Sequence, residues 1–162
     1  MKNALIVIDI QNDYFPGGAF TLENADEACK VAVEAIEQAK RDGWLVVGVQ
    51  HVNSPDAPFF KPDTEGVKTH SAIAAALVDA PIVVKSEADS FFKTNLEQIV
   101  REAGITDIYR TGMMTQHCIT HTALSPQASG MKVHIIAKGC AAPAKALSDL
   151  ALHGLSARCD VV

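Results

Sequence analysis

The residues best suited to chemistry surround Cys118, in the stretch Thr111–Leu124. This stretch follows the apolar run Ile105–Tyr109, and its order indicates a strand, a sharp turn at Gly112 and a helix with Cys118 on its first turn. A thiol there faces the partial positive charge of the helix N-terminus and several unpaired backbone N–H groups. Such a position lowers the pKa of a cysteine from about 8.5 toward the ~3.5–7.5 range of reactive thiols. The spacing therefore predicts that Cys118 is a nucleophile.

Two further reactive side chains end apolar, strand-like runs: Asp9 ends Ala4–Asp9, and Lys85 ends Ile82–Lys85. In an open α/β sheet, ligands bind outside the carboxyl ends of the strands, where the strand order reverses. With the order 3-2-1-4-5-6, Asp9 and Cys118 flank that point, and the long stem of Lys85 reaches it. Each residue alone also fits a turn cap, a solvated lysine or a small buried thiol. Their coincidence at one edge favours a catalytic site.

The elements that must position these residues follow from the hydrophobic pattern. Continuous apolar runs such as Leu5–Ile8 and Val133–Ile136 are typical of strands covered on both faces, and apolar spacing near 3.6 residues indicates helices. The expected strands are Ala4–Asp9, Trp44–Gln50, Ile82–Lys85, Asp107–Thr111, Lys132–Ala137 and Arg158–Val162, and the expected helices span about 24–42, 68–78, 92–103, 116–129 and 143–154. This alternation predicts an α/β fold: a three-layer α/β/α Rossmann-like sandwich with a six-stranded, mostly parallel sheet of order 3-2-1-4-5-6.

The composition limits the class of protein. With 162 residues, 48% of them hydrophobic and 20% charged, we expect a single globular domain over residues 1–162. The formal charge of -5 argues against nucleic acid or an anionic membrane as partner. The N-terminal apolar run is too short for a signal peptide, and no run reaches the ~18 residues of a membrane span. The four cysteines form no C-x-x-C pair and no metal-ligand spacing, so we expect free thiols and a cytoplasmic location.

The longest irregular segment is Val52–Gly66, which contains three prolines together with Phe59 and Phe60. Loops of this length in compact domains are often functional, so a proline-stiffened aromatic loop could form the wall of a pocket. A surface excursion or a subunit contact fits the same composition equally well. Both interpretations stay open.

Three groups of residues, taken in order, resemble the motifs of the isochorismatase-like cysteine hydrolase superfamily, which includes the nicotinamidases. They are Ala4–Phe15 followed by Gly17-Gly18, then Val84-Lys85 with Ser90–Leu96, and Gly112–Thr115 through Cys118 to Thr122-Ala123. Each motif alone is modest, but the ordered set is specific and covers nearly the whole chain. The resemblance implies a six-stranded parallel sheet, an Asp9–Lys85–Cys118 catalytic triad and a homodimer or larger homo-oligomer.

The implied chemistry is coherent. Asp9 would accept the thiol proton while Cys118 attacks a carbonyl carbon, and Lys85 would hold a positive charge beside both groups. The resemblance also implies a non-proline cis peptide at Met113–Met114. Its role would be to direct the N–H of Met114, together with that of Cys118, toward the developing oxyanion.

Other residues near these motifs are candidates for the substrate pocket. Two follow Asp9, one comes directly after the expected second strand, and two flank the nucleophile on its N-terminal side. They are Tyr14, Phe15, His51, Gln116 and His117. Each also fits an ordinary structural role, as a core aromatic residue or as a histidine satisfied at a strand end.

The chain departs from the family pattern at the place where nicotinamidases carry a metal site, an Asp-x-His pair with a further histidine. The corresponding segment reads Gln50-His51-Val52-Asn53, with His70 well downstream. Neutral glutamine and asparagine make a poor divalent site, so we expect neither metal nor cofactor. A second departure is Lys138-Gly139-Cys140 after the fifth strand, where many relatives have an acidic residue. The sixth strand is expected to be short or completed by a neighbour.

These observations predict a cysteine-dependent hydrolase that cleaves a non-peptide C–N bond of a small amide, ureido or carbamoyl compound through a Cys118 acyl-enzyme. The expected partner is a small-molecule substrate. Two alternatives stay open. One is a metal-dependent nicotinamidase or pyrazinamidase, and the other is a non-catalytic small-molecule-binding member of the same fold.

Overall fold

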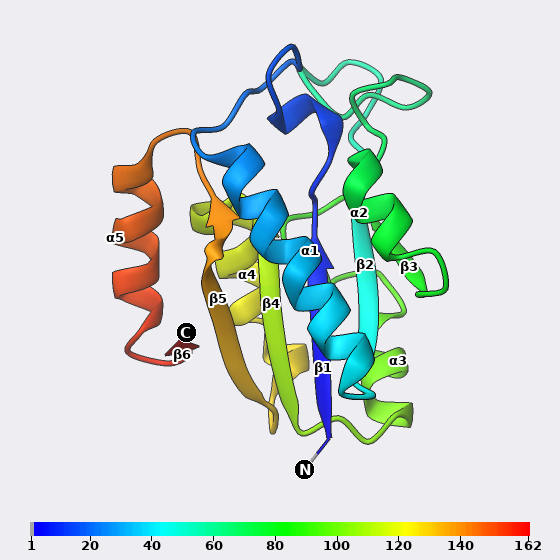
Figure 1. Ribbon diagram of the computed structural model, residues 1–162, viewed down its shortest axis with the longest axis vertical. Helices are drawn as coiled ribbons and strands as arrows, with labels where there is room; N and C mark the ends of the chain where they lie inside the picture. The colour runs from blue at the N-terminus through cyan, green and yellow to red at the C-terminus, as the bar shows by residue number, and fades with distance from the viewer. Residues whose placement is uncertain (1) are drawn as a thin grey trace.

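The computed structural model describes residues 2–162 and contains one six-stranded sheet with helices on both faces (Figure 1). Every strand pair is parallel, and the order β3-β2-β1-β4-β5-β6 is the predicted one. The strands are β1 (Asn3–Ile8), β2 (Leu45–His51), β3 (Ile82–Lys85), β4 (Asp107–Met113), β5 (Lys132–Ala141) and β6 (Asp160–Val161). The order reverses between β1 and β4, so the carboxyl ends of these two strands form the edge at which a ligand is expected.

Helices cover the two faces in separate groups (Figure 1). The α-helices are α1 (Ala25–Arg41), α2 (Ser71–Ala76), α3 (Leu96–Glu102), α4 (Thr120–Ala123) and α5 (Lys145–Leu155). Buried residues of α1 and α2 share one hydrophobic core, and buried residues of α3, α4 and α5 share the other. Within residues 2–162, no helix combines the length and the apolar character that crossing a lipid bilayer requires.

The central strand β1 is buried on both faces because its side chains alternate between the two cores. Leu5 and Val7 pack with α1, whereas Ile6 and Ile8 pack in the opposite layer. On α1 the buried positions recur every three or four residues and are mostly alanine, at Ala25, Ala28, Cys29, Ala32, Ile36 and Ala39. Small side chains on this stripe let the helix lie close to the sheet.

The predicted helix over 116–129 is wrong in detail, because the chain makes three short turns there. Thr115–Ile119 is a π-helical turn, α4 follows directly, and Pro126–Ala128 is a 3-10 turn. Ser125 starts that last turn by accepting a hydrogen bond from the Gln127 N–H. A proline one residue into the turn cannot continue the ladder of an α-helix, which explains the break.

Strands β5 and β6 also differ from expectation. β5 continues to Ala141 through an irregularity opposite Arg110 and Gly112, whereas the expected strand ended at Ala137. β6 (Asp160–Val161) is shorter than the expected Arg158–Val162, and its two residues pair with His134 and Ile135 of β5.

Two connections lie above the carboxyl ends of the strands (Figure 1). One is the 3-10 turn Asn12–Tyr14 after β1, and the other is the segment Val52–Gly66 after β2. Phe60 of the second segment is fully buried, and its ring centroid lies 4.6 Å from that of Tyr14. The aromatic loop is therefore part of the core above this edge of the sheet.

Candidate active site

The structure brings Asp9, Lys85 and Cys118 together at the carboxyl edge of the sheet, where the sequence predicted their convergence. The Lys85 Nζ forms an ion pair with the Asp9 Oδ2 at 2.8 Å and donates a hydrogen bond to the Cys118 Sγ at 3.3 Å. All three residues are buried, with exposed fractions of 0%, 3% and 1%. The acid, the amine and the thiol thus share one buried cluster, although they come from three separate segments of the chain.

The backbone around Asp9 depends on close contact between β1 and β4. Asp9 itself adopts a left-handed conformation with φ of 53°, which is uncommon for a residue other than glycine and is concentrated at functional sites. On β4, Gly112 has φ of 133°, and a Cβ at this position would overlap the Ile8 carbonyl oxygen. Only glycine allows this approach, so Gly112 sets the separation of the two strands that carry Asp9 and Cys118.

Cys118 lies on the π-helical turn Thr115–Ile119, directly after β4. The peptide bond Met113–Met114 is cis, as the family resemblance implies. Thr115 anchors the start of the turn, because its Oγ1 donates to the Ala141 carbonyl at 3.1 Å and lies 2.7 Å from the Ser148 Oγ. The turn is therefore tied to both β5 and α5.

The electrostatics of the cluster keep Asp9 ionised. Burial raises the pKa of the Asp9 carboxyl, but the positive charge of Lys85, together with the neighbouring His51, outweighs burial and holds that pKa below its ordinary value of 3.8. One carboxylate oxygen, Oδ1, is buried without a hydrogen-bond partner. Asp9 is thus a carboxylate with a free acceptor position inside the site.

The predicted low pKa of Cys118 is wrong. Burial raises the pKa of its thiol, the negative charge of Asp9 raises it further, and Lys85 only partly opposes these effects. The helix terminus was expected to dominate, but desolvation of a nearly inaccessible sulfur outweighs it. Cys118 therefore rests as a thiol beside a carboxylate that can accept its proton.

His51 completes the cluster, and its contacts involve two residues that sequence reasoning missed. Its Nδ1 lies 2.6 Å from the Lys85 Nζ, and its Nε2 lies 2.7 Å from the Asn53 Oδ1. The Gln11 side chain holds the His51 backbone, accepting from its N–H and donating to its carbonyl at 2.8 Å each. Gln11 stands two residues after Asp9 in the first motif, and Asn53 two residues after His51, which were the available sequence signals.

A hollow of about 570 Å³ opens beside the cluster. Its lining residues are His51, Asn53, Ser86, Glu87, Ala88, Asp89, Phe92, His117 and His121. The His117 Nδ1 lies 3.5 Å from the Cys118 Sγ, and His51 contacts Lys85, so two wall residues touch the buried cluster directly. Burial, followed by the neighbouring His121, lowers the pKa of His117 and favours its neutral form.

Three of the predicted pocket residues do not line this hollow. Tyr14 and Phe15 are buried in the core beside α1, where Phe15 packs on the ring of His70 at 4.3 Å between centroids. Gln116 faces a separate groove between α4 and α5. The connection after β1 turns its aromatic rings inward and the π-helical turn directs Gln116 away, so only His51 and His117 of the predicted set lie on the hollow.

The residues present do not fit a metal site of the nicotinamidase kind. Both ring nitrogens of His51 have hydrogen-bond partners, and His70 is held by the Ala72 N–H and faces the Cys29 sulfur. Possible ligand atoms of Asp9, His51 and Cys118 lie within 4.8 Å of one another, but the Lys85 ammonium contacts or pairs with all three groups. A cation would have to displace this fixed positive charge.

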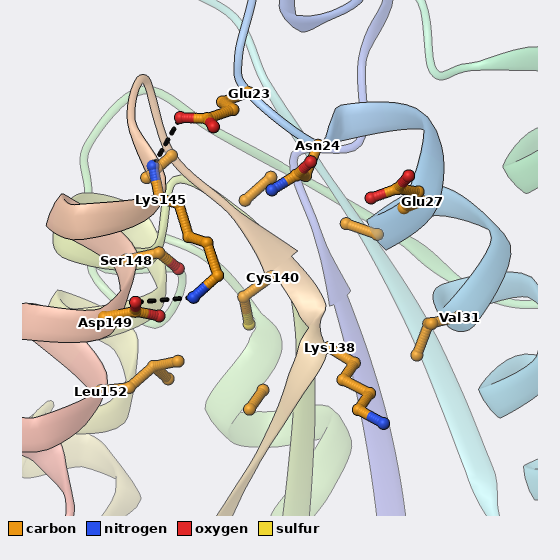
Figure 2. Close-up of a pocket in the computed structure, with 14 residues that line it drawn as sticks. Glu23, Asn24, Glu27, Val31, Lys138, Cys140, Lys145, Ser148, Asp149 and Leu152 are labelled. Atoms are coloured by element: carbon orange, nitrogen blue, oxygen red, sulfur yellow. Dashed lines mark hydrogen bonds and ion pairs between the residues drawn. The ribbon is translucent and has the colours of Figure 1, made fainter.

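A second cavity, of about 440 Å³, lies between α1 and α5 and shares no lining residue with the hollow (Figure 2). Lys138 and Cys140, the residues that depart from the family pattern, line it. The Lys145 Nζ pairs with Asp149 at 2.6 Å, and burial raises the pKa of Cys140 to about 12. The residues that depart from the family pattern after β5 therefore lie away from the Asp9–Lys85–Cys118 cluster.

Comparisons with known proteins identify the family of the chain and agree with its fold. Residues 3–162 match the family model of the isochorismatase domain. An uncharacterized isochorismatase family protein of Bacillus subtilis, YddQ, is 35% identical over 92% of this chain and 83% of its own length. A nicotinamidase of Escherichia coli is 27% identical over 85% of this chain and 82% of its own length. The crystal structure of a nicotinamidase from Bacillus subtilis has a TM-score of 0.91 at 25% identity and covers 100% of this chain and 99% of that one.

Proposed function

The chain belongs to the isochorismatase family, and on that basis we propose that it is a cysteine hydrolase that cleaves a non-peptide C–N bond of a small amide, ureido or carbamoyl compound. The observation that carries the proposal is the contact of one ammonium, Lys85, with both the Asp9 carboxylate and the Cys118 sulfur beside an open hollow. Relatives named as nicotinamidases act on an amide, which supports the choice of bond.

In the proposed first step, Asp9 accepts the thiol proton as the Cys118 Sγ attacks the carbonyl carbon of the substrate. The protonation states at rest suit this transfer, because Asp9 is ionised and Cys118 carries its proton. Lys85 stabilises the thiolate as it forms, since its ammonium already touches the sulfur. The N–H groups of Met114 and Cys118 are proposed to bind the oxyanion that develops on the substrate.

In the second step the C–N bond breaks, and protonated Asp9 donates its proton to the leaving nitrogen. The acyl group remains on Cys118 as a thioester. Asp9, again a carboxylate, then removes a proton from water, which attacks the thioester and releases the acid and the free thiol. Each proton taken up by Asp9 is returned, so the enzyme ends the cycle unchanged.

The two alternative functions have less support. A metal-dependent nicotinamidase needs ligands that this chain replaces with hydrogen-bonded His51 and Asn53. The Asp9–Lys85 pair has 0% side-chain exposure, and removing two charges from water costs free energy. Catalysis accounts for this cost, whereas binding of a small molecule alone does not require the pair.

The proposal is tested by a screen for ammonia release from small primary amides, ureas and carbamates, with Cys118→Ala beside the wild type and Cys140→Ala as the matched control. Both cysteines are buried, but Cys140 lines the cavity between α1 and α5. We expect turnover of at least one compound by the wild type and by Cys140→Ala, and none by Cys118→Ala. Undiminished turnover by Cys118→Ala would reject the mechanism.

A further inference from the structure

We propose that His51 and Asn53 are positioning residues, forming a chain of hydrogen bonds that holds His51 neutral and thereby places the Lys85 ammonium between Asp9 and Cys118. This inference deepens the proposed function and rests on it. It assigns a role to the segment that, in metal-dependent relatives, corresponds to a metal site.

Polar groups crowd around the ammonium of Lys85. Its Nζ lies 2.6 Å from the His51 Nδ1 and 2.9 Å from the Glu87 carbonyl oxygen, in addition to its contacts with Asp9 and Cys118. An ammonium has three protons to donate. The His51 and Glu87 contacts therefore fix the direction of the head group, and the remaining proton points toward the reacting pair.

The hydrogen bonds of this chain all run in one direction, from Lys85 through His51 and Asn53 to the Phe59 carbonyl. The Asn53 Nδ2 donates to the Phe59 carbonyl at 3.0 Å, and a carbonyl can only accept. This contact turns the Asn53 Oδ1 toward the His51 Nε2, which must then carry the ring proton to donate. The Nδ1 of a neutral ring is left with a lone pair, and it faces Lys85, which can only donate. All the hydrogen bonds of this chain are satisfied by one tautomer of His51, with its proton on Nε2, and by one orientation of the Asn53 amide.

The backbone on both sides of this chain is fixed by further hydrogen bonds. The Gln11 side chain brackets the His51 peptide, and the Asn53 N–H donates to the Phe60 carbonyl at 2.9 Å. Phe60 is fully buried. The aromatic loop after β2 is thereby connected through Asn53 and His51 to the ammonium of Lys85.

A second proton on His51 would break this arrangement. Its Nδ1 would then present an N–H to the Lys85 ammonium at 2.6 Å, where both groups are donors and both are positive. The charged or titratable groups that face His51 are Asp9 from β1, Lys85 from β3 and, from the π-helical turn, Cys118 and His117. Asp9 alone favours protonation of the ring, and Lys85 opposes it from a shorter distance.

The test is Asn53→Asp, which keeps an acceptor for the His51 Nε2 but adds a negative charge that stabilises the doubly protonated ring. We expect the acidic limb of the pH profile of kcat/KM to move to higher pH, with about tenfold less activity at pH 6 relative to pH 8 than in the wild type. The double variant His51→Gln/Asn53→Asp should lack this limb, because no imidazole remains to titrate. Asn24→Asp, at an exposed residue of the cavity between α1 and α5, is the control for added charge and should follow the wild-type profile.

A second variant and a second readout guard against misfolding and against an incorrect choice of substrate. Asn53→Ser removes the bond to His51 without adding charge and should lower kcat about tenfold at nearly constant KM. The rate at which iodoacetamide alkylates Cys118 in these variants shows, without any substrate, whether the chain of hydrogen bonds through Asn53 and His51 affects the thiol. If Asn53→Asp and Asn53→Ser match the wild type in the pH profile, kcat and alkylation rate, the positioning role is rejected while the proposed hydrolase function stands. Failure of the hydrolase function would instead appear as the absence of Cys118-dependent turnover in the wild type.

Discussion

At the scale of single residues, the buried Asp9–Lys85 pair places a negative charge next to the thiol that is proposed to react. Burial and, after it, this charge raise the pKa of Cys118, and the same carboxylate provides the acceptor for its proton. A cysteine of this kind is activated when it transfers its proton during attack, and a pre-formed thiolate is not required.

Asp9→Asn therefore separates the ease with which the Cys118 thiol ionises from the rate of turnover. Removal of the negative charge should lower the pKa of the Cys118 thiol, so its alkylation by iodoacetamide should begin at lower pH than in the wild type. Turnover should nevertheless fall about 100-fold to 10,000-fold, because the proton acceptor and donor is lost. The measurement is the pH dependence of alkylation, with peptide mapping to identify Cys118, beside kcat. An alkylation profile that stays in place or moves to higher pH would contradict this account of the thiol.

The sequence was informative about which residues meet, because the ends of parallel strands share an edge and Asp9 and Lys85 each end an apolar run. It was misleading about the pKa of Cys118, since the depth of burial depends on the packing of distant segments over the sulfur. The tie from Gln11 to His51 and the bond from Asn53 to His51 could not be predicted for the same reason, because they join side chains whose orientation the tertiary fold decides.

At the scale of elements, the contact between β1 and β4 determines how closely Asp9 and Cys118 approach. Gly112→Ala should lower the free energy of unfolding by about 2–4 kcal/mol, because its left-handed backbone and the overlap with the Ile8 carbonyl both oppose a side chain. It should also lower kcat, since relief of the overlap moves the two strands apart. Urea unfolding and steady-state kinetics check the two effects.

Gly154→Ala is the matched control on α5. A Cβ at Gly154 would meet no atom within 4 Å, and alanine is the better helix former. This variant should be more stable than the wild type by about 0.5–1 kcal/mol, with unchanged kcat. Equal stability of the Gly112→Ala and Gly154→Ala proteins would contradict the role given to the β1–β4 contact.

Most elements were predictable from periodicity, and the exceptions have local causes. β1 and α1 agree to within a residue or two because their apolar patterns are long and regular. The segment after β4 reads as one helix, but Thr120 donates its hydroxyl to the Thr115 carbonyl within the π-helical turn, and Pro126 interrupts the run. These side-chain interactions with the backbone compete with the helical ladder and leave little trace in the hydrophobic pattern.

At the scale of the whole molecule, both the protein and the lining of the hollow carry negative charge. The chain has a formal charge of -5, and Glu87 and Asp89 lie among the hollow's lining residues, which include no lysine or arginine. We therefore expect an amide that carries a positive charge to have a higher kcat/KM than a neutral or anionic amide of the same size, with the preference declining as salt is added.

Glu87→Gln should reduce this preference about two- to threefold, whereas Glu37→Gln, at an exposed residue of α1, should leave it unchanged. The comparison needs kcat/KM for a matched pair of cationic and anionic amides at low and high ionic strength. An equal loss in both variants would show that the overall charge of the protein is responsible, and a preference for the anionic amide would contradict the account of the hollow.

The most direct test of the central claim, that the sulfur of residue 118 carries the acyl group during turnover, is mass spectrometry of enzyme quenched in acid with an excess of a turned-over amide. We expect a mass increase equal to the acyl group, confined to the peptide that contains Cys118, reversed by hydroxylamine and absent from Cys118→Ala. Turnover at full rate without an adduct on that peptide, and with activity retained by Cys118→Ala, would contradict it.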